Sequence, residues 1–505
     1  MARKHKAPDL TDARRVLKRV FGLEEFRPGQ EDIIRAVLAG HDTLGIMPTG
    51  AGKSLCYQIP ALLLPGTTIV VSPLISLMKD QGDKLVDMGL AAAQMNSTLT
   101  AREEDAHLRE IAADGHEFVL TTPERLATAD FRETLKQTTI DLIVVDEAHC
   151  ASQWGHDFRP AYLEIKDAIA ALGAPPVLAL TATAPDRVLD DIIDLLGLRQ
   201  PTIVNTGIYR PNLHFEVART VNEPQKRERL VKLLQETDGT GIIYASTVRQ
   251  VDVLYDLLKG LGFETAKYHG RMAPKQRKES QERFMAGDVQ ALVATNAFGM
   301  GIDKPDIRFV VHYNMPGSLE AYYQEAGRAG RDAAVSRCLL FYQLEDRRTQ
   351  IYFLSGRYPR HEEIQSVYGA LETTGAATSA VPLSAVKAAA AVADTKFRVV
   401  VALLKDLGIV REQRGSMLKL LRSGISGGQL TAMADDYRTR QSADREKLDR
   451  MMAYGQSAAC RWKLLLDYFG ETVEWERCGV CDNCRHPLEE QVIPPGERVE
   501  AADNG

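Results

Sequence analysis

The feature that most constrains the fold of this chain is a glycine-rich turn, Met47-Pro48-Thr49-Gly50-Ala51-Gly52-Lys53-Ser54. It follows a β-prone run, Asp42–Ile46, and precedes a helix-compatible run, Leu55–Gln58. Glycines let backbone N–H groups turn inward around phosphate oxygens, and a helix N-terminus adds its positive dipole end. In such a loop the lysine reaches the β- and γ-phosphates and the serine hydroxyl holds Mg²⁺. Because Met47 stands where the strict pattern has glycine, a turn without a ligand is the alternative.

Composition sets limits on the function. The chain has 505 residues, 45% hydrophobic and 26% charged, which is typical of a multidomain globular protein. Its formal net charge of −6 excludes a global basic field, so a nucleic-acid site must be a local patch. The basic segment Met1–Lys6 lacks the apolar part of a secretory signal, and no apolar run is long enough to cross a bilayer. We therefore expect a cytoplasmic protein with no membrane partner.

Strand-like and helix-like segments alternate in the first part of the chain. The strand-like runs are β-branched and almost wholly apolar, which is typical of strands buried on both faces of a parallel sheet. They are Thr68–Ser72, Phe118–Thr122, Leu142–Asp146 and Val177–Thr181. This alternation predicts a doubly wound α/β domain, in which ligands bind beyond the carboxyl ends of the strands.

Two carboxylates stand at the end of one of these apolar runs, in Asp146-Glu147-Ala148-His149. Burying them unpaired is costly, and a metal ion removes that cost. We expect Asp146 to hold Mg²⁺, and Glu147 to orient and deprotonate an attacking water. His149 lies on the same turn and is a candidate link to whatever the protein moves. The alternative is an exposed acidic turn.

The segment that follows combines aromatic and basic residues: Gln153, Trp154, His156, Phe158 and Arg159. Aromatic faces with an arginine suit stacking on unpaired bases. A loop in this place would report nucleic-acid occupancy to the carboxylates beside it. A packed loop anchored by Trp154 explains the same residues and remains open.

A second α/β domain begins near Gly207, with buried strand-like runs at Gly241–Ala245 and Ala291–Thr295. Arg328 and Arg331 lie three positions apart, which predicts one shared face on a helical turn. Two guanidiniums aimed at a γ-phosphate would stabilise the charge that develops during transfer. The alternative is a solvated basic helix face.

Beyond residue 345 the pattern changes. Residues 362–425 predict three helices, the last capped by Asp394, and a hairpin around Arg414-Gly415. This order suggests a winged helix, a fold that serves in DNA binding and in protein docking. Residues 435–469 predict a helical hairpin with Cys460 on its second helix.

Four cysteines are crowded near the end of the chain, at Cys460, Cys478, Cys481 and Cys484. In a reducing compartment, two tight C-x-x-C steps indicate a metal site more than disulfides. Four thiolates suit tetrahedral Zn²⁺ in a structural site. Free thiols are the alternative.

These motifs together resemble the RecQ group of superfamily 2 helicases. The resemblance covers residues 10 to 345 and resumes at the cysteines, and the segment Asp146–Tyr162 is its most specific part. It implies two RecA-like domains, ATP hydrolysis and 3′ to 5′ unwinding of DNA. It also marks Arg27 and Gln30 as adenine contacts, and places the segment that includes Asp303 against DNA and the nucleotide sugar.

Two departures from the family stand out. Leu23 occupies a position where the family commonly has an aromatic residue that stacks on adenine. The expected winged helix also precedes the cysteines, whereas in well-known members it follows them. We further expect no C-terminal accessory helical domain after Cys484.

We therefore expect an ATP-dependent DNA helicase with ATP, Mg²⁺ and structural Zn²⁺, acting in DNA repair or recombination. Expected partners are single-stranded DNA and tailed or forked duplexes, with a single-strand-binding protein as a further candidate. The resemblance implies a bacterial-type, nucleoid-associated monomer. Predicted domains are 1–206 and 207–345 (RecA-like), 346–425 (winged helix), 426–487 (zinc-binding helical hairpin) and 488–505 (disordered tail). A translocase or RNA-directed ATPase, and a nucleotide-gated binding or annealing protein, remain alternatives.

Overall fold

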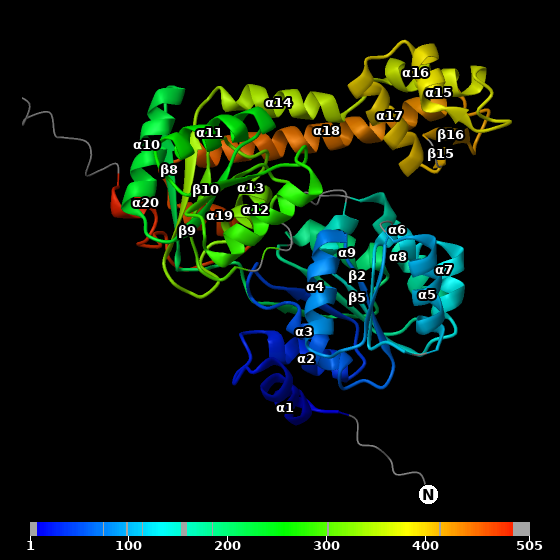
Figure 1. Ribbon diagram of the computed structural model, residues 1–505, viewed down its shortest axis with the longest axis horizontal. Coiled ribbons are helices and arrows are strands. Elements are labelled where there is room, and N and C mark those ends of the chain that lie inside the picture. Colours follow the sequence, from blue (N-terminus) through cyan, green and yellow to red (C-terminus); the bar gives the residue numbers. More distant parts are fainter. Residues whose placement is uncertain are drawn as a thin grey trace, which may run out of the picture. The chain divides into compact units, whose positions relative to one another are not determined.

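Strand β1 (Thr43–Ile46), which leads into the glycine-rich turn, belongs to a seven-stranded parallel sheet of order β3-β4-β2-β5-β6-β1-β7 in the computed structural model. Figure 1 labels β2 and β5 of this sheet, among the helices of the first domain. The structure describes residues 8–73, 75–96, 99–113, 115–152, 159–183, 185–299, 302, 304–413 and 416–487. The other strands of this sheet are β2 (Thr67–Val71), β3 (Ala92–Met95), β4 (Phe118–Thr121), β5 (Ile140–Val145), β6 (Val177–Thr181) and β7 (Thr202–Asn205).

Helices cover both faces of this first sheet. They are α1 (Leu10–Phe21), α2 (Gln30–Leu38), α3 (Leu55–Ala61), α4 (Ile75–Asp87), α5 (Ala101–Ala112), α6 (Pro123–Leu126), α7 (Ala129–Leu135), α8 (Ile165–Ala171) and α9 (Asp186–Leu196). Successive residues of one strand enter different hydrophobic cores: Leu142 and Val144 of β5 join one, and Ile143 and Val145 join the other. Burial on both faces explains why these strands are apolar throughout.

The second domain contains a six-stranded parallel sheet of order β10-β11-β9-β12-β13-β8. Its strands are β8 (Leu213–Arg219), β9 (Thr240–Tyr244), β10 (Thr265–Tyr268), β11 (Ala291–Ala294), β12 (Ile307–His312) and β13 (Ser336–Tyr342). Its helices are α10 (Glu223–Glu236), α11 (Val248–Gly260), α12 (Pro274–Ala286) and α13 (Leu319–Ala326). The two predicted doubly wound domains are therefore confirmed.

Residues 344–452, with 317–319, form a separate compact unit. It contains α14 (Asp346–Arg357), α15 (His361–Thr373), α16 (Leu383–Ala390) and α17 (Asp394–Asp406), with β14 (Val381–Pro382), β15 (Val410–Gln413) and β16 (Met417–Leu420) in an antiparallel sheet of order β14-β16-β15. The predicted winged helix is confirmed. One detail was wrong: Asp394 is the first residue of α17, and Ala393 is the N-cap.

The end of this unit differs from the predicted domain boundary. Helix α18 is continuous from Gly427 to Gln456, and most of it groups with the winged helix, because the unit extends to Met452. Helix α19 (Arg461–Tyr468) and α20 (Asp482–Arg485) follow. No described helix combines the length and the apolar character that a membrane crossing requires. The predicted tail, 488–505, lies outside the described residues.

Candidate nucleotide and zinc sites

The glycine-rich turn has the backbone of a phosphate loop. Gly50 and Gly52 adopt left-handed conformations, with φ of 87° and 82°, and Ser54 is the N-cap of α3. The Met47 side chain is fully buried in the core beneath the loop, beside the Cys56 sulfur. Its side chain therefore does not enter the space where phosphates would lie, which explains why methionine is compatible with this position. Lys53 Nζ donates to the Met47 carbonyl at 3.3 Å.

The acidic pair lies at the carboxyl end of β5, in the middle of the first sheet. The Asp146 N–H donates to the Val71 carbonyl at 2.9 Å, and the Tyr162 hydroxyl donates to the Asp146 carbonyl at 2.9 Å. Glu147 adopts a left-handed backbone with φ of 49°, which is strained for this residue type. The peptide between β5 and the following turn is thus held firmly in an unusual conformation.

The same pair has the electrostatics of a cation site. Burial, and then the neighbouring Glu147 charge, raise the pKa of Asp146 to about 7. One Glu147 carboxylate oxygen, Oε2, is buried without a hydrogen bond and lies 3.3 Å from His149 Nδ1. Two carboxylates that destabilise each other in a buried place suit a divalent cation, whose charge offsets both. These residues therefore fit Mg²⁺.

Two of the residues predicted to contact DNA lie among the described residues, and each binds a residue at or just after the end of a strand of the first domain. His149 Nδ1 lies 3.0 Å from the hydroxyl of Thr181, which itself donates to the Thr183 carbonyl at 3.0 Å. Arg159 Nη1 donates to the Pro73 carbonyl at 2.6 Å. The predicted DNA contacts Gln153, Trp154, His156 and Phe158 lie outside the described residues.

The two predicted arginine fingers lie beyond a helix end. Helix α13 ends at Ala326, and Arg328 and Arg331 occupy the turn after it, so the predicted shared helix face was wrong. The turn nevertheless orients them. Arg328 is buried and donates to the Gly299 carbonyl, and a Cβ on Gly50 would lie 2.8 Å from the Arg331 side chain.

One cavity of about 680 Å³ joins these elements from both α/β domains. Its lining includes most of the predicted nucleotide-site residues: Arg27, Gln30, Thr49, Gly50, Gly52, Lys53, Ser54, Asp146, Glu147, Arg328 and Arg331. Ala51 is in the loop but not in the lining, and Asp303 lies outside the described residues. Phe21, which the sequence did not single out, lines the cavity beside Leu23. An aromatic ring is therefore present there despite Leu23.

The two residues marked for adenine contact the phosphate loop itself. Gln30 is buried, and its Nε2 donates to the Gly52 carbonyl at 2.9 Å and to the Ala51 carbonyl at 3.2 Å. Its Oε1 accepts from the Arg27 N–H at 2.9 Å, and the Arg27 guanidinium donates to the Gly50 carbonyl. These contacts link the segment before α2 to the loop, whatever else the two side chains bind.

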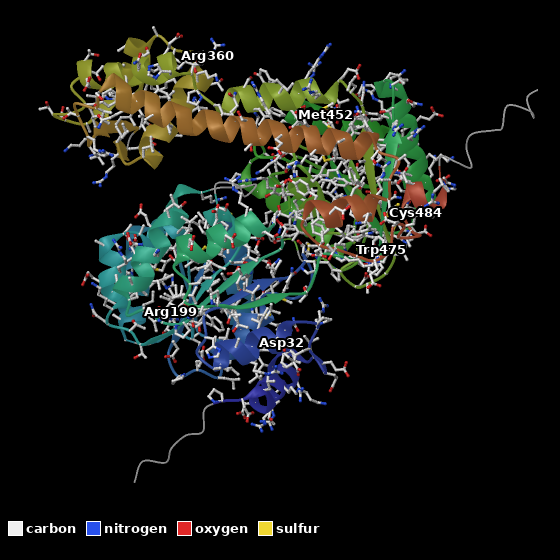
Figure 2. The ribbon with its side chains drawn as sticks, turned by 180° about the vertical axis from the view of Figure 1, so that it is seen from behind. Asp32, Arg199, Arg360, Met452, Trp475 and Cys484 are labelled. Atoms are coloured by element: carbon white, nitrogen blue, oxygen red, sulfur yellow. The ribbon has the colours of Figure 1, made fainter. Side chains whose placement is uncertain are left out.

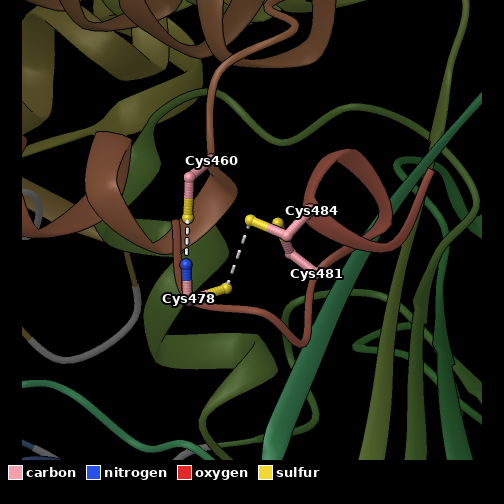
Figure 3. Close-up of side chains that lie close together, drawn as sticks. All are labelled: Cys460, Cys478, Cys481 and Cys484. Atoms are coloured by element: carbon pink, nitrogen blue, oxygen red, sulfur yellow. Dashed lines mark hydrogen bonds between the residues drawn. The ribbon is translucent and has the colours of Figure 1, made fainter. Parts of the chain in front are cut away.

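The four cysteines converge as predicted. Their sulfur atoms all lie within 4.8 Å of one another, and those of Cys478 and Cys484 are 3.9 Å apart (Figure 3). Zn–S bonds of about 2.3 Å in a tetrahedron place sulfurs about 3.8 Å apart. The residues present therefore fit Zn²⁺. Cys460 is the N-cap of α19, so its predicted place on the helix was wrong by one residue.

The cysteine-bearing segment, residues 453–487, packs on the second α/β domain, and we call it the zinc module (Figure 2). Two of its contacts are with β8, an edge strand of the second sheet. Asp482 accepts from the Val217 N–H at 2.8 Å, and buried Trp462 donates to the Leu213 carbonyl at 3.0 Å. Asp482 also binds the buried Arg461 guanidinium at 2.9 Å. The module thus protects a sheet edge that would otherwise be available for pairing.

Comparison with protein families assigns the class. Residues 27–192 match the DEAD/DEAH box helicases, 225–333 the helicase conserved C-terminal domain, and 419–485 the RecQ zinc-binding family. The crystal structure of the DUF1998 helicase MrfA bound to DNA has the same fold, with a TM-score of 0.56 at 18% identity over 83% of this chain and 63% of that chain. The family matches and the fold together define the two-domain core of a helicase.

Curated relatives narrow the class to a family. The ATP-dependent DNA helicase RecQ of Bacillus subtilis (strain 168) is 45% identical over 355 residues, 70% of this chain and 59% of that protein. The probable ATP-dependent DNA helicase RecS of the same organism is 36% identical over 483 residues, 95% of this chain and 93% of that protein. The chain belongs to the RecQ family of helicases. It spans less than two thirds of that RecQ, and nearly all of RecS.

Proposed function

We propose that this chain is an ATP-dependent DNA helicase that translocates on single-stranded DNA from 3′ to 5′ and acts in DNA repair or recombination. One observation carries the proposal: a single cavity brings Lys53, the Asp146–Glu147 pair and the Arg328–Arg331 turn together from two RecA-like domains. Such a cavity opens and closes as nucleotide is bound and released, which moves one domain relative to the other.

In this proposal each residue has one task. Lys53 and Ser54 bind the phosphates, and Asp146 holds the Mg²⁺ that neutralises them. Glu147 orients and deprotonates the attacking water. Arg328 and Arg331 stabilise the charge that develops on the γ-phosphate. The rest of the nucleotide is bound by residues of the first domain, with Asp303 from the second. Those of the first domain are Arg27, Gln30, Thr49, Gly50, Ala51 and Gly52.

DNA is the nucleic acid on which we propose that the protein translocates. The proposed DNA contacts are Gln153, Trp154, His156 and Phe158, and His149 and Arg159, which flank them in the sequence, bind strand ends of the first domain. Contacts to backbone phosphates make binding salt-sensitive and largely independent of base sequence. Single-stranded, tailed and forked DNA are the proposed substrates of a monomeric enzyme, with a single-strand-binding protein as a further partner.

The test is strand displacement on duplexes that carry either a 3′ or a 5′ single-stranded tail, with ATP, Mg²⁺ and parallel phosphate release. We expect displacement from the 3′ tail alone and phosphate release stimulated by DNA. Displacement from the 5′ tail would contradict the polarity. DNA-stimulated phosphate release without displacement would indicate a translocase, and stimulation by RNA alone would overturn DNA as the substrate.

A further inference from the structure

Arg210, in the linker of residues 206–212 that connects β7 to β8, makes a set of hydrogen bonds that the proposed function does not use. Its guanidinium donates to four backbone carbonyls. Nη1 reaches Gly327 at 2.7 Å and Thr49 at 3.3 Å, and Nη2 reaches Gly330 at 2.6 Å and Ala329 at 2.8 Å. No described carboxylate forms an ion pair with it. The planar fork of arginine allows several such bonds at once, which lysine cannot reproduce.

The four carbonyls belong to the two sides of the nucleotide cavity. Thr49 is in the phosphate loop of the first domain, and Gly327, Ala329 and Gly330 surround the arginines of the second. Asn212 adds a bond from Nδ2 to the Gly330 carbonyl at 2.8 Å. A single side chain therefore fastens the arginine-bearing turn and also contacts the opposite wall.

We infer that Arg210 is a positioning residue, which holds the turn with Arg328 and Arg331 in register with the phosphate loop. This inference rests on the proposed ATPase function. Arg210 does not line the cavity, so it acts through the alignment of other groups. Misplacement of a catalytic group by about 1 Å lowers turnover by up to about 100-fold.

The zinc module holds the same linker from its other side. Glu471 accepts from the Ile208 N–H at 2.7 Å, and the Tyr209 ring packs against Trp462 and Trp475, with centroids 5.0 and 5.3 Å away. The Ile208 carbonyl accepts from the Tyr323 hydroxyl at 2.6 Å. The linker therefore connects the zinc module to the catalytic turn, and disturbance of either end is expected to reach the other.

The test is a double-mutant cycle in ATP turnover on the full chain with saturating DNA. Arg210→Ala should lower kcat at least about 10-fold, with the Kd for a fluorescent ATP analogue unchanged within 3-fold. In an Arg328→Ala/Arg331→Ala background, Arg210→Ala should cost no further activity, because its effect passes through those two arginines. Arg337→Ala, which removes a guanidinium forked onto Glu216 away from the cavity, is the matched control.

The outcomes separate this inference from the proposed function. No ATPase activity in the wild-type chain would remove the proposed function itself. Wild-type turnover in Arg210→Ala, or a further loss when Arg210→Ala is added to the variant that lacks both Arg328 and Arg331, would overturn the inference alone. If Arg210→Ala does not fold, Arg210→Lys decides: reduced kcat at unchanged Kd supports positioning, and unchanged kcat excludes it.

A second, independent observation concerns His107, Glu110 and His116, at the end of α5 and in the segment that leads into β4. Glu110 Oε2 lies 3.6 Å from His107 Nδ1 and 3.4 Å from His116 Nε2. Both nitrogens of His116 and Nδ1 of His107 are buried without a hydrogen bond. Such groups are costly unless an ion or water satisfies them.

The geometry points to a second metal site, for Zn²⁺ or a similar transition-metal ion, with these three ligands and one water. Metal–ligand bonds of about 2.0–2.1 Å in a tetrahedron place ligand atoms about 3.4 Å apart, which is close to both measured distances. Glu110 is 58% exposed, so solvent reaches the site, and we expect weaker binding than at the four cysteines. A bound ion would join the end of α5 to the start of β4.

The test is a titration of the purified zinc-loaded chain with Co²⁺, followed by calorimetry and visible absorption. We expect one further ion to bind, with d–d bands but no thiolate charge-transfer band, and a rise in melting temperature. His107→Ala and His116→Ala should each weaken binding at least about 10-fold, and His41→Ala, an exposed histidine elsewhere, should not. Unchanged binding in both histidine variants, or no additional ion in the wild type, would overturn the site.

Discussion

Glu147→Gln should lower kcat for ATP hydrolysis by at least about 100-fold, because an amide cannot take the proton of the attacking water. The Kd for ATP should change little, since Lys53, Ser54 and Asp146 keep their places. Phosphate release under saturating ATP and DNA, with separate measurement of nucleotide binding, separates the two effects. Turnover within 3-fold of the wild type would remove Glu147 from the role of water activation.

The melting temperature of Glu147→Gln tests whether the variant is folded, and the electrostatics of the acidic pair predict its direction of change. Burial and the Glu147 charge hold the pKa of Asp146 at about 7, against 3.8 for the isolated group. The folded state therefore binds this proton more tightly, so the Asp146 contribution to stability falls as pH rises from about 4 to 7. Removing the Glu147 charge should leave the melting temperature at pH 8, without Mg²⁺, at or above that of the wild type. Glu164→Gln, an exposed carboxylate outside the cavity, should change neither turnover nor melting.

Local sequence predicted the parts of the site that local backbone geometry determines. The phosphate loop and the Asp146–Glu147 turn each follow an apolar strand directly, so strand pattern and motif together indicated their place. Strands β3 and β7 were not predicted, because they lie at the edges of the sheet and are only partly buried. An edge strand lacks the continuous apolar run on which the prediction depended.

The contacts that assemble the site were not predictable in this way. Arg210 donates to carbonyls that lie more than a hundred positions away in the sequence, both upstream and downstream. Every residue has a backbone carbonyl, so the sequence carries no sign of which ones are bound. The only available signal was the run Arg210-Pro211-Asn212 immediately before β8. The use of Asp482 to cover β8 was hidden for the same reason, since its partner Val217 is 265 positions away.

Loss of the zinc site is the other change with a large expected effect. The free energy of metal binding in a closed thiolate site contributes directly to the free energy of folding, with apparent values of about 10–16 kcal/mol in zinc-finger peptides. Cys481 is fully buried, and its sulfur accepts from the Arg461 N–H at 3.4 Å. Cys481→Ser removes a thiolate from the site and disturbs the start of α19. Without the metal, Trp462 and Asp482 lose the framework that holds them on β8.

We therefore expect Cys481→Ser to retain little zinc through gel filtration and to melt at a lower temperature, by about 2–4 °C for each kcal/mol of stability that is lost. Elemental analysis and thermal melting measure both effects. Cys338→Ser is the matched control, because that buried cysteine lies outside the cluster and faces the Ala326 carbonyl, a partner for the new hydroxyl. Wild-type zinc content and melting in Cys481→Ser would contradict the assignment. Since the module also holds the linker through Glu471, partial loss of zinc should lower ATP turnover before it lowers nucleotide affinity.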